Sequence, residues 1–336
     1  MLVLGIETSC DECSAAIVED GRRILSNVIA TQIELHRPFD GVVPELASRL
    51  HTEWISQVVD AAVRQAGIER GDIEAIAATA RPGLLGSLLV GLNFAKGMAA
   101  VIGVPFIGID HIRAHLYAPQ IEKPLEYPYL GVLLSGGHTV ICRVDSYDSI
   151  DVLGTTVDDA IGEAFDKVAK HYGLGYPGGV MIDALAQKGD PMAFKFSGPK
   201  MNTSYHPYDI SYSGLKTAVI NQLEIFSTGK PATAENIAAS FQRVAVGMLI
   251  KRVERALKDT GLKRVSAGGG VAANSLVRSS LKAFENEGYK VSFPSLKLCT
   301  DNGAMVAGLG YRYIQDGITS DFSLSASARV RAFKKG

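Results

Sequence analysis

Cysteine is scarce in this chain, with four residues among 336. So few cysteines cannot build the dense disulfide scaffold of a small secreted protein. The stretch Leu2–Glu7 also lacks the basic segment and the long apolar core of a signal peptide. Both absences lead us to expect a protein of the reducing cytoplasm.

Long apolar runs are also absent, and the net charge is close to zero. We find no uninterrupted apolar stretch of the ~18 residues that a membrane span needs, so no membrane association is expected. The net charge is −1, which argues against a generally basic surface but leaves a local basic path or a basic partner possible. Hydrophobic residues make up 47% and charged residues 21%, the balance of a globular protein with a large core.

The patterning alternates between strand-like and helix-like segments, which favours an α/β fold. The expected strands cover residues 2–6, 15–18, 73–78, 104–109, 130–134, 139–142, 264–267 and 290–293. The expected helices cover residues 44–66, 87–101, 158–171, 213–225, 234–258, 272–285 and 301–314. A chain of this length predicts two lobes rather than one domain of ~100–200 residues.

The opening of the chain is repeated near its middle. Leu2–Ile6 leads through a polar loop into Ala15–Val18, and Leu130–Leu134 leads through another into Thr139–Cys142. This similarity indicates an internal duplication. We therefore expect lobes at residues 1–125 and 126–336, each opening with a hairpin whose loop faces a shared cleft. The second lobe would carry helical insertions, and the end of the chain could pack back on the first.

The spacing of His111 and His115 is that of a metal-binding pair, because side chains four residues apart lie on one face of a helix. The metalloprotease version of this motif has glutamate after the first histidine, where this chain has Ile112. The spacing therefore favours a metal but not that protease mechanism. Two surface histidines are the alternative, and a metal would need a further oxygen ligand from elsewhere.

Two glycine-rich segments are candidates for ligand binding. Ser135–Thr139 could present backbone N–H groups to an anion, although a tight hairpin turn explains it equally well. Gly268–Asn274 lies between a predicted strand and helix, where a ligand could reach the helix N-terminus. Neither segment is a dinucleotide fingerprint or a P-loop. We interpret Cys10 and Cys13 as loop residues, because no second cysteine pair completes a zinc site.

Eight segments in this order resemble one family over essentially the whole chain. They are Gly5–Glu12, Gly41–Arg49, His111–His115, Leu134–Thr139, Gly162–Lys167, Tyr176–Gly179, Gly268–Asn274 and Thr300–Gly303. The match resembles the bacterial TsaD family of tRNA N6-adenosine threonylcarbamoyltransferases, which belongs to the TsaD/universal Kae type and was formerly labelled O-sialoglycoprotein endopeptidase. The resemblance implies an actin/Hsp70/sugar-kinase-like fold, with two ribonuclease-H-like lobes around a central cleft.

The resemblance also implies an activity and a set of residues. The threonylcarbamoyl group of threonylcarbamoyl-AMP would move to N6 of adenosine 37 in tRNAs that read ANN codons. Asp301, from the second lobe, would join His111 and His115 in holding one Fe²⁺ or Zn²⁺ ion. The positions implied to contact the substrate are Leu133, Leu134, Ser135, Gly136, Gly137, Asp166, Gly179, Asp183 and Asn274.

The general base is left open, with Asp11, His138 and the phosphate of the substrate as candidates. The family implies a TsaB-like paralogue, a TsaE-like ATPase and tRNA as partners. Basic residues near the chain end suit shared tRNA binding, or form a solvated tail; they are Arg329, Arg331, Lys334 and Lys335. The rival functions are a metallopeptidase, an ATPase or kinase, and a scaffold without catalysis.

Two positions depart from the family pattern. Cys13 stands where relatives commonly have threonine, and Arg81 stands where glycine is common. We expect the first to alter the first loop slightly and the second to place a charge near the mouth of the cleft. Neither is a proposed metal ligand.

Overall fold

The chain forms two compact units in a computed structural model that describes residues 1–198 and 206–329. Unit 1 joins Met1–Leu125 to the segment that begins at Pro294, and unit 2 comprises Glu126–Phe293. The segment after Pro294 therefore belongs with the start of the chain. Of the basic residues near the chain end, Arg331, Lys334 and Lys335 lie outside the described residues.

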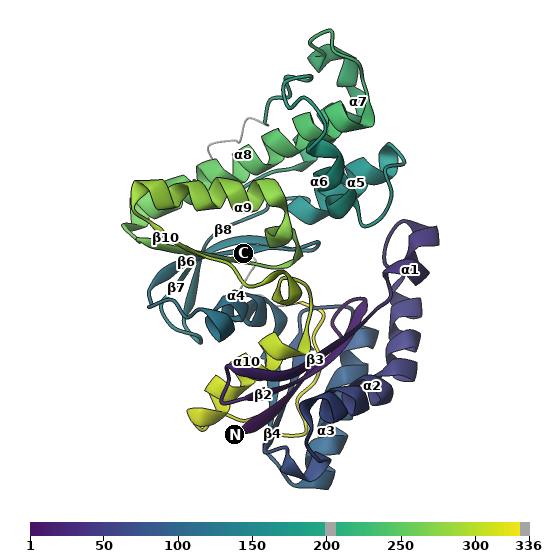
Figure 1. Ribbon diagram of the computed structural model, residues 1–336, viewed down its shortest axis with the longest axis vertical. Coiled ribbons are helices and arrows are strands. Elements are labelled where there is room, and N and C mark those ends of the chain that lie inside the picture. The colour runs from purple at the N-terminus through teal and green to yellow at the C-terminus, as the bar shows by residue number, and fades with distance from the viewer. Residues whose placement is uncertain (199–205, 330–336) are drawn as a thin grey trace. The chain divides into compact units, whose positions relative to one another are not determined.

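Unit 1 is built on a five-stranded sheet (Figure 1). Its order is β3 (Arg23–Thr31), β2 (Glu12–Glu19), β1 (Leu2–Glu7), β4 (Ala75–Arg81) and β5 (Phe106–Asp110). The first three strands in sequence are antiparallel neighbours, whereas β4 runs parallel to β1 and β5 parallel to β4. The strand β3 was not among the predicted elements.

Unit 2 repeats this topology. Its sheet has the order β10 (Lys290–Ser292), β9 (Arg264–Gly268), β6 (Tyr129–Leu134), β7 (Thr139–Val144) and β8 (Ile150–Thr155). Again an antiparallel hairpin and a third strand lie on one side, and two parallel strands lie on the other. The shared topology confirms the predicted α/β class and the duplicated hairpins.

Helices cover both faces of the sheet of unit 1. The side chains of Leu4 and Ile6 pack against α2 (Pro44–Ala66) and α3 (Leu85–Ile102). The intervening Gly5 faces the opposite way, toward α10 (Gly303–Gln315), and α4 (His111–Glu122) packs along α10 (Figure 1). A short helix, α1 (Ile33–His36), follows β3. The core of unit 1 thus has three layers.

The larger helical share predicted for the second half lies in unit 2. Its helices are α5 (Ile161–His171), α6 (Gly178–Ala186), α7 (Ser213–Asn221), α8 (Ala234–Thr260) and α9 (Ser275–Lys282). The core includes the buried rings of Phe165 and Phe241, whose centroids are 5.0 Å apart. The expectation of a single helix over residues 272–285 is wrong. Asn274 caps α9 by accepting hydrogen bonds from the backbone N–H groups of the next turn, so only a 3-10 turn precedes it.

One described helix, α3, is long and apolar enough to span a membrane by length and composition alone. It packs against α2 and β4 within unit 1. Core helices of soluble proteins pass the same test, and one face of α3, which includes Leu88, Leu92 and Ala95, is buried in unit 1.

The contact between β1 and α10 is one of backbone against backbone. A Cβ atom on Gly5 would lie 2.2 Å from the carbonyl oxygen of Gly303 and 2.5 Å from the backbone nitrogen of Ala307. The backbone N–H of Gly303 donates to Ser14 Oγ at 2.9 Å. The first turn of α10 is therefore fixed on the sheet by glycine and by one hydrogen bond.

We expect Gly5→Ala to lower the free energy of unfolding by about 1–3 kcal/mol, because the added methyl group has no space beside α10. Chemical denaturation measures this loss. The matched control is Gly97→Ala on α3, where a Cβ atom meets nothing within 4 Å. That change should be neutral or stabilise the protein by up to ~1 kcal/mol, since alanine is the better helix former. Equal effects of the two changes would contradict the close contact.

Candidate functional site

Both histidines of the predicted metal site lie on α4. This helix begins where β5 ends, and Asp110 caps it by accepting hydrogen bonds from the N–H groups of Ile112 and Arg113 at 3.0 and 3.2 Å. His111 and His115 are one helical turn apart, so their side chains share a face. Both are buried. Their rings are nearly perpendicular, with centroids 4.5 Å apart.

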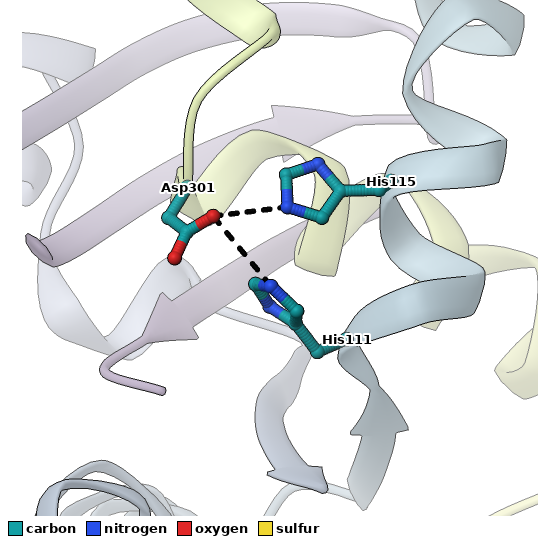
Figure 2. Close-up of side chains that lie close together, drawn as sticks. All are labelled: His111, His115 and Asp301. Atoms are coloured by element: carbon teal, nitrogen blue, oxygen red, sulfur yellow. Dashed lines mark hydrogen bonds and ion pairs between the residues drawn. The ribbon is translucent and has the colours of Figure 1, made fainter. Parts of the chain in front are cut away.

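Asp301 reaches these histidines from the loop before α10 (Figure 2). Its Oδ1 atom lies 2.9 Å from His115 Nε2 and 3.5 Å from His111 Nε2. The next residue, Asn302, caps α10 by accepting the N–H of Met305 at 3.0 Å, which holds the loop. All three candidate ligand residues belong to unit 1. The expectation that Asp301 comes from the second lobe is therefore wrong, because α10 packs on the first sheet.

The ring of His111 is oriented by Glu7, which ends β1, and by Ser9, which follows shortly after it. Its Nδ1 atom lies 3.1 Å from Glu7 Oε2 and 3.1 Å from Ser9 Oγ. A carboxylate can only accept, so in neutral His111 the proton lies on Nδ1 and the Nε2 lone pair faces Asp301. Thr79 Oγ1 donates to the same oxygen of Glu7. Histidines that bind a metal through one ring nitrogen usually donate the N–H of the other to a group such as a carboxylate.

The charges around this cluster favour a cation. Burial opposes the charged form of His111, but the carboxylates of Asp301 and Glu7 outweigh it and raise its pKa to about 9. Burial and the charge of His111 lower the pKa of His115. Burial and then the charges of Asp11 and Asp301 raise the pKa of Glu12 well above its ordinary value. With both imidazoles neutral, a divalent cation would balance the charges of Glu7 and Asp301.

The donor atoms fit a metal ion. They are two imidazole nitrogens and a carboxylate oxygen, all within 4.8 Å of one another. Ligands bound at ~2.1 Å to one ion are separated by about 3.0–3.4 Å, and the two distances to Asp301 Oδ1 bracket that range. Nδ1 of His115 is buried without a hydrogen-bond partner among the described residues. Of the two histidines, His111 is therefore the candidate ligand whose ring is held by hydrogen bonds to its second nitrogen.

The candidate substrate contacts all lie in unit 2. Leu133 and Leu134 end β6, and Ser135–Gly137 form the turn to β7. In this turn the N–H of Ser135 donates to the carbonyl of His138 at 2.9 Å, and the N–H of His138 donates to Ser135 Oγ at 3.0 Å. A Cβ atom on Gly162 would lie 2.7 Å from the carbonyl oxygen of Ser135. The start of α5 is thus packed directly against this turn.

A hydrogen-bonded group brings Asp183 and Asn274 together. Gln242 on α8 donates through Nε2 to Asp183 Oδ1 at 3.1 Å and accepts from Asn274 Nδ2 at 3.0 Å. The N–H and hydroxyl groups of Ser275 also donate to Asp183, at 3.0 and 2.7 Å. Sequence reasoning missed Gln242 and Ser275. A buried amide on an otherwise apolar face of α8 was the available signal for Gln242.

Asp166 and Gly179 are also close to each other. Asp166 Oδ1 accepts the N–H of Gly178 at 2.8 Å, at the first turn of α6. A Cβ atom on Gly178 would lie 2.6 Å from the Cα atom of Asp166. The start of α6, which carries Gly179, is therefore held against α5.

The two candidate bases lie in different units. Asp11 is buried in the turn between β1 and β2 of unit 1, whereas His138 lies in the turn between β6 and β7 of unit 2. No distance within a unit singles out either residue as the base.

The two positions that depart from the family pattern, Cys13 and Arg81, both lie in strands of unit 1. Cys13 is a free thiol buried in β2, so the interpretation of Cys13 as a loop residue is wrong, and burial raises its pKa to about 12. The half-exposed Arg81 ends β4 and places its Nε atom 3.7 Å from Asp110 Oδ2. Arg81 therefore lies beside the residue that caps the histidine-bearing helix.

Comparison with known proteins gives a consistent result. The sequence profile described as TsaD, tRNA N6-adenosine threonylcarbamoyltransferase, matches residues 23–308. A protein of that name from Treponema denticola is 57% identical over 336 residues, which cover 100% of this chain and 99% of the relative. Another from Treponema pallidum is 51% identical and covers 100% of this chain and 95% of the relative.

Solved structures support the fold. Full-length HypF in a phosphate- and nucleotide-bound form gives a TM-score of 0.64 at 15% identity, over 95% of this chain and 47% of that one. Component A of (R)-2-hydroxyglutaryl-CoA dehydratase from Acidaminococcus fermentans gives 0.57 at 18% identity, over 94% and 99%. These similarities confirm the two-lobe fold class of the actin/Hsp70/sugar-kinase type.

We expect Glu7→Gln to weaken binding of a divalent metal by about 10–100-fold, because the amide no longer offers two accepting oxygens behind His111. Isothermal titration with Zn²⁺ measures the affinity. Glu45→Gln is the control, since Glu45 is exposed on α2 and its ion pair among the described residues is with Arg49, one turn away. Unchanged affinity of the Glu7 variant would show that this carboxylate does not support the site.

Proposed function

Because this chain belongs to the tRNA N6-adenosine threonylcarbamoyltransferase family, we propose that it transfers the threonylcarbamoyl group of threonylcarbamoyl-AMP to N6 of adenosine 37 in tRNAs that read ANN codons. The observation that carries this proposal is the alignment of relatives named for the activity over the whole chain. The names of these relatives favour neither the metallopeptidase nor the kinase alternative.

The metal centre of this proposal consists of His111, His115 and Asp301, which would hold one Fe²⁺ or Zn²⁺ ion. Two histidines and a carboxylate are typical of non-haem iron, and three protein ligands are typical of catalytic zinc. Such an ion supplies Lewis-acid stabilisation of negative charge on carbonyl and phosphate oxygens. Glu7 and Ser9 would keep the His111 ring oriented through its Nδ1 atom.

The residues of unit 2 would bind the nucleotide part of the substrate. The backbone N–H groups of the Ser135–Gly137 turn would face the phosphate, with Leu133 and Leu134 behind them. Asp166, Gly179, Asp183 and Asn274 would hold the adenosine. Asp183 suits this role because Gln242 and Ser275 already fix its carboxylate.

The reaction itself forms one bond and breaks another. The exocyclic amine of adenosine attacks the carbamoyl carbon, a C–N bond forms, and the C–O bond to the phosphate breaks as AMP leaves. The amine loses one proton, which Asp11, His138 or the departing phosphate would accept. Holding the two reactants in line accounts for much of the rate enhancement expected of such a site.

The proposed partners are a TsaB-like paralogue, a TsaE-like ATPase and tRNA, in the cytoplasm. Leu85 and Leu89, one turn apart on α3, are 49% and 42% exposed and offer the paralogue an apolar contact.

We expect the double variant His111→Ala with His115→Ala to bind no divalent metal and to lose threonylcarbamoyl transfer by at least ~100-fold. The reason is that one carboxylate alone cannot hold the ion. Metal content by mass spectrometry and nucleoside analysis of tRNA supplied with threonylcarbamoyl-AMP and partners give both readouts. His171→Ala, an exposed position on α5, is the control. Full transfer by the metal-free double variant would refute the metal's role.

We expect Asp183→Asn to raise the KM for threonylcarbamoyl-AMP about 10–150-fold, because a neutral amide loses one charge-assisted hydrogen bond of ~1.5–3 kcal/mol. The KM for tRNA should stay unchanged in the same steady-state assay. Asp151→Asn, on the exposed side of β8, is the matched control. If both KM values rose together, Asp183 would have a structural role instead.

A further inference from the structure

The chain after α10 lies along the edge strand β5 of unit 1; we call residues 318–329 the C-terminal strap. The N–H of Ser320 donates to the carbonyl of Phe106 at 2.7 Å, and Ser320 Oγ accepts the N–H of Gly108 at 3.1 Å. The ring of Phe322 stacks on Phe106 with centroids 6.3 Å apart. Leu324 fills the space above Gly108, where a Cβ atom would lie 2.1 Å from its side chain. The first half of the strap is thus anchored in the core.

The second half of the strap reaches the end of β4. The N–H of Ser327 donates to the carbonyl of Ala80 at 3.0 Å, at the point where the pairing of β4 with β5 shifts its register. The N–H of Gly83 donates to the carbonyl of Ala328 at 3.4 Å. Two backbone hydrogen bonds therefore tie the strap to the end of β4 and the turn that follows it; we call residues 80–84 the 80–84 turn.

That turn holds Ser9. The N–H of Leu84 donates to the carbonyl of Ser9 at 2.8 Å. A Cβ atom on Gly83 would lie 2.5 Å from the same carbonyl oxygen, so the two backbones are in contact. Ser9 in turn donates its N–H to Glu7 Oε1 at 2.6 Å and has its hydroxyl 3.1 Å from His111 Nδ1. An unbroken series of contacts leads from the strap to the imidazole.

We propose that the C-terminal strap is a positioning element of the metal centre. It braces the 80–84 turn, the turn fixes Ser9, and Ser9 and Glu7 orient the ring of His111. The inference rests on the proposed metal site, to which the strap contributes no ligand. Mutation of a group that is hydrogen-bonded to a metal ligand typically weakens metal affinity 10–100-fold. Loss of the two hydrogen bonds between the strap and the 80–84 turn should weaken it about tenfold.

Two shortened chains test whether the hydrogen bonds made by Ser327 and Ala328 affect metal binding. A chain ending at Ala326 keeps Leu324 in the core but loses both hydrogen bonds to the turn. A chain ending at Arg329 keeps every described contact of the strap. We expect the first to bind Co²⁺ about tenfold more weakly than the full chain, with a changed visible absorption spectrum. The second should match the full chain in both measurements.

Point variants of the full chain give the same comparison without shortening it. Ser327→Pro removes the N–H that binds the carbonyl of Ala80, whereas Ser327→Ala keeps it and removes only the hydroxyl. The proline variant should bind Co²⁺ as weakly as the chain that ends at Ala326. The alanine variant should have the Co²⁺ affinity and the spectrum of the full chain. Thermal unfolding without metal shows whether each variant is folded at the temperature of the titration.

The outcomes distinguish the two proposals. If the full chain binds no Co²⁺, the metal centre fails and the strap inference fails with it. If the full chain binds Co²⁺ and the folded 326-residue chain binds it equally well, only the strap inference is overturned. A lowered metal-free melting temperature with unchanged Co²⁺ affinity and spectrum would likewise overturn it, since the strap would then only stabilise the fold.

Discussion

The close contact of β1 with α10 is the constraint on which unit 1 depends. Gly5 and Gly303 have no side chains, so the helix backbone reaches the strand backbone directly. The helix comes from the end of the chain, and its first turn carries the Asn302 cap. Asp301 therefore stands beside histidines that are almost two hundred positions earlier in the sequence. A bulkier residue at either glycine would move the carboxylate away from the imidazoles.

Both units place their candidate functional groups at the same edge of the same topology. In unit 1, Glu7 ends β1 and Asp110 ends β5, just before His111. In unit 2, Ser135 follows β6 and the glycine segment of residues 268–270 follows β9. Carboxyl ends of parallel strands are the usual ligand-binding edge of α/β sheets. The duplicated fold thus carries an acidic, imidazole-rich edge in one unit and a glycine-rich edge in the other.

Local signals in the sequence predicted the elements that have clear ends. The helix expected over residues 44–66 has those bounds, because Pro44 opens its first turn and Gly67 ends it at a φ of 70°. The strands β3 and β8 were missed because most of their residues are only partly buried and polar residues interrupt their apolar segments. Spacing identified the two histidines, but only the resemblance supplied Asp301. No local pattern encodes contacts such as those of Glu7 with His111 or Gln242 with Asp183, which arise from packing between distant elements.

Unit 1 is discontinuous in sequence, and this has a consequence for the order of folding during synthesis. Unit 2 is a continuous segment, so all its residues have been made when Phe293 leaves the ribosome. The first sheet by then has its five strands but still lacks α10 and the strap. Domains usually fold in the order in which they are synthesised, whereas here the unit that starts first is completed last. A nascent chain therefore contains all three candidate metal ligands only after the whole of unit 2 has been synthesised.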